Sequence, residues 1–278
     1  MTESIALPSA VGLGRVLLAL LLPAASLRGG GDALTEGWDQ GARLFFNEAA
    51  RTFASARGTG VDAESERVLG RAVMLLGVQP RTGANLEAAR ALLQGLIGSE
   101  ATGEAAIAAR YYLARLDQLH TDQPDLERAR GHYRDLVERH PDHFFGQLAR
   151  LKLAMLVLYA PARPASLATR LPEAEKWGEG ITDPVLRCQY HLMLAGALAR
   201  EDGREAERLE HLLAMEATGR VIRDPTRSLM LVEIGETARV VGRRAEAVRA
   251  YRQFIAEFPR DVRVGAIRAR LAEVEGVP

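Results

Sequence analysis

Three histidines and an aspartate form the densest group of metal-ligating side chains in this sequence. His132 lies within a helical segment, and His140 and His143 flank Asp142 at its end. Imidazole nitrogens and a carboxylate at such short spacing can hold a zinc ion. Pro141 interrupts the group, however, and no HExxH motif or second acidic cluster accompanies it, whereas cations at the carbonyl end of a helix are explained by the helix dipole. We therefore expect neither a metal site nor another cofactor.

Cys188 is the only cysteine, which excludes an internal disulfide and a cysteine-based zinc site. Its neighbour Arg187 would favour a thiolate, but no histidine–acid arrangement can be assigned to it, so we expect a buried hydrophobic role. The glycines at 29–31 lack the lysine and the preceding strand of a phosphate-binding loop. No GxSxG motif or pair of catalytic carboxylates is recognisable. The sequence thus predicts no catalytic residue, and we interpret the chain as a non-enzyme.

The composition favours packed helices. Apolar residues make up 47% of the 278 residues, but aromatic residues only 5%, and Ala, Leu, Arg and Glu dominate. This mixture suits helices that meet through small side chains better than it suits β-sheets. The 36 basic and 36 acidic residues cancel, whereas a nucleic-acid-binding protein usually has a basic excess. Nucleic acid is therefore not expected as a partner.

The amino terminus has the pattern of a secretory signal peptide. Arg15 precedes an apolar run at 16–25, and Ala24 and Ser26 supply the small residues that cleavage requires. We predict a signal peptide at 1–26, a flexible linker at 27–32, and export of residues 33–278 to a bacterial periplasm or the exterior. The run is too short to span a bilayer comfortably, so no stable membrane span remains after cleavage. An uncleaved anchor, or an apolar helix packed on the others, is the alternative.

A pattern of small and apolar residues organises the chain and is most complete between Leu231 and Pro259. Apolar residues recur three and four positions apart on both sides of Gly242, which predicts two amphipathic helices joined by a tight turn. Gly235 and Ala247 are small enough to let two helices cross closely, and Gly242 can adopt the left-handed conformation that ends a helix. The aromatic residues expected to fill the space beside this crossing are Tyr251 and Phe254.

This segment resembles the tetratricopeptide repeat family, whose unit contains a large residue, an aliphatic residue and Gly, then Ala-x3-aromatic, and then Pro. A second segment shares part of the pattern, in Ala129, Tyr133 and Pro141. One helical hairpin cannot bury both of its faces, so neighbouring hairpins are expected. Further helices are predicted at 62–77, 86–97, 103–120, 126–140, 144–159, 172–178, twice within 183–219, and at 261–274, capped by Asp261. Residues 33–56 are expected to form one long helix or the second half of a degenerate pair.

A direct internal repeat supports stacked units. Five residues recur in the same order and spacing: Glu175, Gly178, Ile181, Asp183 and Pro184 return as Glu216, Gly219, Ile222, Asp224 and Pro225. An aspartate before a proline favours a helix start, because the carboxylate accepts from free amides and proline needs no acceptor. The predicted fold is therefore all-α: a right-handed solenoid of helical hairpins similar to the tetratricopeptide repeats, with about five pairs between leading and trailing helices.

The resemblance implies a function in binding. In this family the first helix of each pair lines a concave groove whose exposed residues select the ligand. Carried onto this sequence, the groove residues are Arg67, Arg71, Tyr111, Gln118, Tyr190, Arg200, Glu236 and Arg239. Cations with tyrosines suit a peptide that bears acidic or carboxylate groups, although a solvated face without a ligand would have similar residues.

We therefore predict a non-catalytic scaffold that binds a protein or peptide, not a small-molecule substrate, in the bacterial envelope. The stretch ending IAEFPRD and the helix after it are similar to repeats in envelope-assembly and TolA-binding tetratricopeptide proteins. A docking or regulatory subunit of a larger enzyme complex is the first alternative. A helical-repeat enzyme with an unrecognised site is the second.

Overall fold

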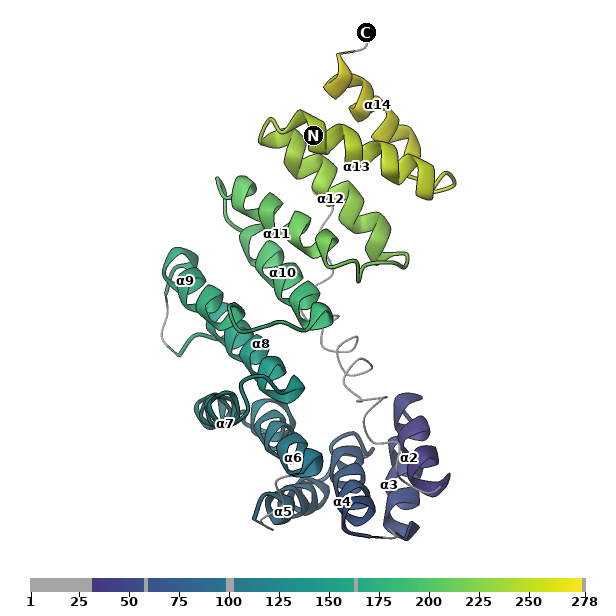
Figure 1. Ribbon diagram of the computed structural model, residues 1–278, viewed down its shortest axis with the longest axis vertical. Coiled ribbons are helices and arrows are strands. Elements are labelled where there is room, and N and C mark those ends of the chain that lie inside the picture. Colours follow the sequence, from purple (N-terminus) through teal and green to yellow (C-terminus); the bar gives the residue numbers. More distant parts are fainter. Residues whose placement is uncertain (1–31, 58–59, 99–102, 163–164, 277–278) are drawn as a thin grey trace. The chain divides into compact units, whose positions relative to one another are not determined.

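The computed structural model describes residues 32–57, 60–98, 103–162 and 165–276, so the candidate signal peptide and the first residues of the linker lie outside it. Within these ranges every regular element is a helix and no strand is present (Figure 1). The all-α class predicted from composition and periodicity is confirmed. The helices divide into two compact units, unit 1 up to Leu136 and unit 2 from Val137 onward.

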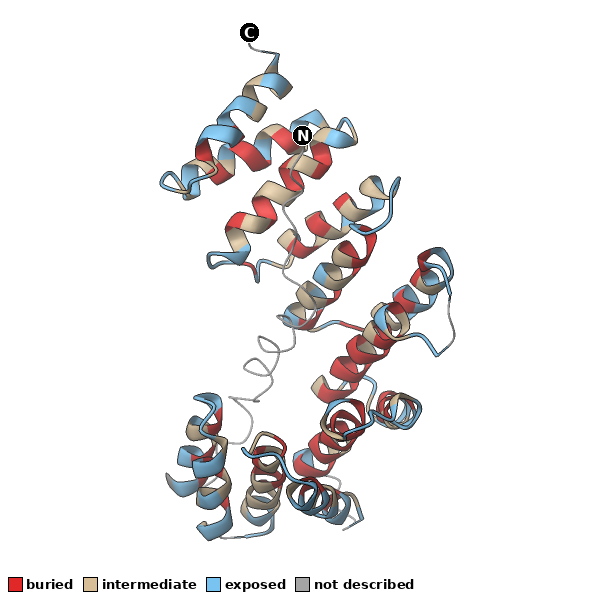
Figure 2. Cartoon of the chain, turned by 180° about the vertical axis from the view of Figure 1, so that it is seen from behind, coloured by how far each residue is buried: buried red, intermediate tan, exposed pale blue. Residues whose placement is uncertain are grey.

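In unit 1, successive helices pack against one another, and α4 also contacts both α2 and α6. The elements are α2 (Asp32–Ala42), α3 (Phe46–Ser55), α4 (Val61–Leu75), α5 (Gly83–Gly98), α6 (Glu104–Arg115), the π-helical turn η1 (Leu116–His120) and α7 (Leu126–Arg139), within which the unit boundary falls. Buried residues gather on the sides that face neighbouring helices (Figure 2). At the start of the unit, Phe53 lies fully buried between Leu34 and Met74.

Unit 2 is also built from helices that pack on their neighbours in sequence. Its elements are α8 (Phe144–Tyr159), α9 (Leu167–Gly178), α10 (Pro184–Leu198), α11 (Glu205–Ala217), α12 (Thr226–Val240), α13 (Arg244–Glu257) and α14 (Val264–Glu275). One apolar core extends from α10 to α14, with Tyr251 and Phe254 fully buried in it. Packing of each helix mainly on its sequence neighbours is the arrangement of helical repeats.

The segment 33–56 is not one long helix, because the chain turns sharply at Leu44. Leu44 has a φ of 67°. The amide of Phe45 donates to the carbonyl of Gln40, and that of Leu44 donates to the carbonyl of Gly41, both at 2.9 Å. This is the Schellman motif that ends many helices, with leucine in the position that usually requires glycine. The expected glycine signal is missing from the sequence, which is why the break was not predicted.

Two predicted helix starts are also wrong. Helix α9 begins at Leu167, before Pro172, because the hydroxyl of Ser166 accepts from the amide of Thr169 at 3.3 Å and caps the first turn. Helix α14 begins at Val264, and Asp261 accepts from the amide of Arg263 at 2.8 Å, outside that helix. The Ser166 cap thus places the start of α9 ahead of Pro172, whereas α14 starts without a side-chain cap.

The internal repeat is only partly preserved in three dimensions. Asp183 caps α10 as predicted, since its carboxylate accepts from the amides of Val185 and Leu186 at 2.9 and 3.0 Å. Its counterpart Asp224 caps no helix, because α12 starts after Pro225 and has no side-chain cap. The two isoleucines of the repeat also differ in burial: Ile181 is 4% exposed, whereas Ile222 is 75% exposed.

The helix crossing predicted at Gly235 is confirmed. A Cβ atom placed on Gly235 of α12 would collide with the ring of Tyr251 on α13, and Ala247 beside this crossing is fully buried. Gly242 has a φ of 76° and ends α12 in the same hydrogen-bonding motif that Leu44 completes. Glycine thus permits the close approach at Gly235 and avoids the cost of a left-handed backbone at Gly242.

Replacing Gly235 with alanine should lower the free energy of unfolding by about 1–3 kcal/mol, because the Tyr251 ring must move out of a packed core. The matched control is Gly196→Ala in α10, where a Cβ would meet only the Tyr159 hydroxyl at 3.7 Å. That variant should gain about 0.5–1 kcal/mol, since alanine loses less backbone entropy in a helix. Urea unfolding of both variants measures these changes. Equal changes in the free energy of unfolding would contradict close packing of Gly235 against Tyr251.

Candidate functional site

The structure does not place all eight predicted groove residues on a surface. Tyr111, Gln118 and Tyr190 are only 0%, 3% and 7% exposed. These three side chains are therefore buried within their units and do not lie on an exposed face. The resemblance to the tetratricopeptide repeats implied exposure, but each side chain is covered within its unit.

Each buried residue has an internal partner. The Tyr111 ring packs against Tyr133, with 5.9 Å between ring centroids. Gln118 accepts hydrogen bonds from the Tyr133 hydroxyl at 2.8 Å and from Arg115 at 3.2 Å. The Tyr190 ring lies where a Cβ on Gly178 would be. These side chains connect helices within their units.

The other five predicted groove residues lie at least partly in solvent. On α4, Arg67 forms an ion pair with Glu64 at 2.6 Å, and Arg71 is half-buried one turn further along. On α12, Glu236 pairs with Arg239 at 3.2 Å. The remaining member is Arg200, whose guanidinium lies 5.5 Å from the centre of the Tyr159 ring. Glu236 also accepts from the Tyr251 hydroxyl at 2.9 Å and pairs with Arg270 at 2.9 Å, so it takes part in a network on this face.

The residues considered for metal or thiol chemistry have structural contacts. His143 accepts from the amide of Phe145 at 3.2 Å and thus caps α8, while its ring centroid is 6.4 Å from that of His140. Cys188 is partly buried against the unit 2 core, and burial raises the pKa of its thiol. Among the described residues, no three His, Cys, Asp or Glu side chains gather as a metal site would require.

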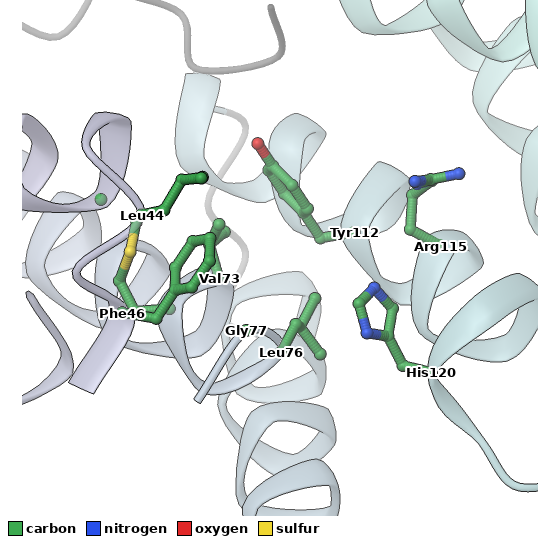
Figure 3. Close-up of a pocket in the computed structure, with 10 residues that line it drawn as sticks. Leu44, Phe46, Val73, Leu76, Gly77, Tyr112, Arg115 and His120 are labelled. Carbon is green, nitrogen blue, oxygen red and sulfur yellow. The ribbon is translucent and has the colours of Figure 1, made fainter. Parts of the chain in front are cut away.

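A partly enclosed apolar cavity, here called the unit 1 cavity, lies between the α2–α3 turn, α4 and α6 (Figure 3). It is lined by Gly41, Leu44, Phe46, Val73, Met74, Leu76, Gly77, Tyr112, Arg115 and His120. Figure 3 shows Leu44 and Phe46 on one side, with Tyr112, Arg115 and His120 on the other. Its volume is about 60 Å³, which holds a few water-sized groups, whereas drug-sized ligands occupy ~300 Å³ or more. The cavity therefore suits a single chemical group.

Arg115 brings a buried positive charge to the wall of this cavity. Its side chain is 6% exposed and donates to the amide oxygen of Gln118. The ionisable groups that act on it are the tyrosines 111, 112 and 133, and no carboxylate of the described residues pairs with it. A guanidinium stays protonated at all physiological pH values, and burying an unpaired charge is costly. An anion that entered the cavity would remove this cost.

His120 lies beside Arg115 and adds a neutral hydrogen-bonding group. Burial lowers the pKa of His120 to about 4, and the charges of Arg115 and Arg81 act in the same direction. The imidazole is therefore uncharged at neutral pH, and Arg115 supplies the positive charge at the cavity wall. An apolar rim, a fixed guanidinium and a neutral imidazole together favour a carboxylate attached to a small apolar group.

The cavity mouth carries exposed apolar side chains on a strained turn. Leu44 is 57% exposed and Phe45 54% exposed. A non-glycine residue in the left-handed region costs roughly 1–2 kcal/mol, and such strain is often retained at binding sites. Leu44 is largely in solvent, so packing against the other described residues does not account for a leucine here.

Replacing Leu44 with glycine should raise the free energy of unfolding by up to about 1 kcal/mol, because relief of strain exceeds the added entropy of the unfolded chain. The same change should weaken ligand binding, since it removes an apolar group from the cavity rim. Urea unfolding and a binding titration measure the two effects. Leu119→Gly is a control at another exposed leucine, 46% exposed, and should destabilise. A Leu44→Gly protein that is less stable than the wild type would contradict the inference that the backbone at Leu44 is strained.

A buried carboxylate holds together the elements next to this cavity. Asp117 in η1 is 1% exposed and accepts from Arg90 of α5 at 2.7 Å. Its second oxygen lies 3.3 Å from Arg128 and 3.4 Å from His132, both on α7. Three helical elements thus converge on one carboxylate, and π-helical turns such as η1 occur often at functional sites.

No protein-family model matches the sequence, and the comparison with curated proteins found no match. None of the helices in the described ranges has the length and apolar character that crossing a membrane requires.

Proposed function

We propose that this chain is a non-catalytic helical-repeat scaffold that binds a protein partner through a carboxylate, which enters the unit 1 cavity and pairs with Arg115. The observation that carries the proposal is the buried guanidinium of Arg115, which has no carboxylate partner among the described residues and lines an apolar cavity. The exposed Leu44 and Phe45 beside it offer apolar contact to the residues that flank the carboxylate.

A tetratricopeptide-like, right-handed arrangement of hairpins is part of this proposal. It is supported by one hydrogen bond that occurs in both units. Tyr133 donates to Gln118 at 2.8 Å in unit 1, and Tyr251 donates to Glu236 at 2.9 Å in unit 2, each across fifteen residues. In each pair the tyrosine belongs to the second helix of a hairpin and its acceptor to the preceding helical element. The same contact at the same spacing favours a repeated unit over unrelated hairpins.

The proposal places the scaffold in a bacterial envelope, on the strength of the signal-peptide pattern before Ser26. Binding without catalysis is supported by the cavity volume of about 60 Å³, which accommodates an anchoring group better than a complete substrate.

The test is affinity capture with the full chain from cells that produce it, followed by cross-linking and mass spectrometry. Cross-links should connect the partner to the residues around Leu44 and Phe45. Titration with the partner's peptides should then show binding that depends on a carboxylate. Amidating the peptide's carboxyl terminus and changing its Asp or Glu residues to amides distinguish a terminal from a side-chain carboxylate. Binding that survives both changes would refute the proposal.

A further inference from the structure

Two histidines meet between neighbouring helices of unit 2. His191 on α10 and His211 on α11 lie with their Nδ1 atoms 3.1 Å apart, and their ring centroids are separated by 5.4 Å. Both side chains are partly exposed, so solvent reaches the pair. A nitrogen of one imidazole therefore hydrogen-bonds directly to a nitrogen of the other.

The spacing of these two nitrogens is compatible with a shared metal ion. With metal–nitrogen bonds of about 2.0–2.1 Å, nitrogens 3.1 Å apart subtend an angle of roughly 100° at the ion, near the tetrahedral value. In the metal-free pair only one Nδ1 carries a hydrogen. Moving that hydrogen to Nε2 of the same ring would leave two Nδ1 lone pairs for the metal, without loss of a proton.

Burial of the two rings disfavours their charged form, and metals bind the neutral form. Burial lowers the pKa of His191 to about 4, with further contributions from His211 and Arg187. Burial also lowers the pKa of His211, against the opposing effect of Glu207 and Glu210.

The nearby carboxylates are engaged elsewhere. Glu207, one turn before His211, is held by Arg204, whose Nε lies 2.6 Å from the carboxylate, and Glu210 pairs with Arg243. Solvent would therefore supply the remaining ligands.

We propose that His191 and His211 form a two-histidine site for a divalent transition metal ion that bridges α10 and α11, with water completing the coordination shell. Imidazole ligands suit Zn²⁺, Ni²⁺ and Cu²⁺, and Cu²⁺ binds most tightly in this series. Because the ion joins two helices of the folded state, binding stabilises that state in proportion to metal concentration.

The experiment uses the untagged full chain, freed of metal with a chelator, in calorimetric titrations and thermal unfolding with Zn²⁺, Ni²⁺ or Cu²⁺. One ion should bind per chain, with Cu²⁺ tightest, and the unfolding temperature should rise with metal concentration. His191→Asn and His211→Asn should each weaken binding at least tenfold and abolish that rise. Mg²⁺ should have no effect, since it prefers oxygen ligands.

His140→Asn is the matched control, because it removes a histidine that lies near another histidine and should leave binding unchanged. Thermal unfolding without metal shows whether each variant is folded. For a variant that does not fold, electron paramagnetic resonance of the Cu²⁺-loaded wild-type chain should show two coordinated nitrogens. Binding that both variants retain, loss of binding in His140→Asn, or a copper spectrum with fewer than two nitrogens would overturn the proposal.

Discussion

Replacing Arg115 with methionine should weaken binding of the carboxylate-bearing partner by about 30-fold or more, while the protein stays folded. Removing one member of a buried charge pair across an interface typically costs 2–5 kcal/mol of binding free energy, and the lower value corresponds to about 30-fold in Kd. Without ligand, Arg115 has no carboxylate among the described residues to compensate its buried charge. Methionine fills a similar volume without that charge, so the free energy of unfolding should stay constant or rise.

Arg110→Met provides the matched control for this prediction. Arg110 lies on the same helix, is one-quarter exposed and faces Asp135 at 3.9 Å, so it carries the same charge outside the cavity. Its loss should change Kd by less than threefold, because a partly exposed ion pair contributes little. Calorimetric titration of the captured partner into the three proteins, with circular dichroism to confirm folding, measures both effects. Equal losses from the two variants would show that general electrostatic attraction, and not the cavity, holds the partner.

Arg115→Met separates a ligand site from a structural role because the two predict opposite changes in stability. If Arg115 served only to hold Gln118 in place, its loss would lower the free energy of unfolding and affect binding only through unfolding. A stable variant that no longer binds is expected from a ligand site alone. Extra stability on removal of a functional group is common where a site retains an unfavourable arrangement.

The helices of this protein could be predicted from its sequence because their signals are local. The apolar spacing of Phe144–Tyr159 gave the bounds of α8 without error, and Gly242 marked the turn between α12 and α13. The break at Leu44 had no such signal, since leucine takes the left-handed conformation there at an energetic cost. Sequence patterns indicate the backbone conformation that each residue type adopts at low energy. They therefore fail to predict a turn in which a residue adopts a strained conformation.

The candidate site was harder to predict than the fold because it depends on which side of a helix is covered. Tyr111 was expected on an exposed face and is fully buried. Arg115 was not among the predicted site residues, yet it lines the cavity. One signal was present: Arg115 follows Tyr111 and Tyr112 by four and three positions, so a charge lies in an apolar stripe. A charged residue at a core position indicates either a buried partner or a ligand. Only the structure shows whether an internal partner exists.

The largest stability effect is expected at Asp117, the buried carboxylate of η1. Asp117→Leu should lower the free energy of unfolding by about 3–5 kcal/mol, because it leaves Arg90 largely buried without its carboxylate. Arg90 is 14% exposed, whereas Arg128 is 49% exposed and can turn to solvent. The loss should therefore come mainly from Arg90. Urea unfolding at neutral pH measures it.

The double variant Asp117→Leu with Arg90→Leu tests this origin, because replacing both members of a buried ion pair by apolar residues is often nearly neutral. We expect it to recover more than half of the stability lost in Asp117→Leu, a strongly non-additive result. Asp117→Leu with Arg128→Leu is the matched control and should recover little, since Arg128 is half exposed. Equal recovery in the two double variants would mean that the loss of stability is shared between Arg90 and Arg128. Recovery with Arg90 alone would show that one buried ion pair fixes η1 against α5, next to the residues that line the cavity.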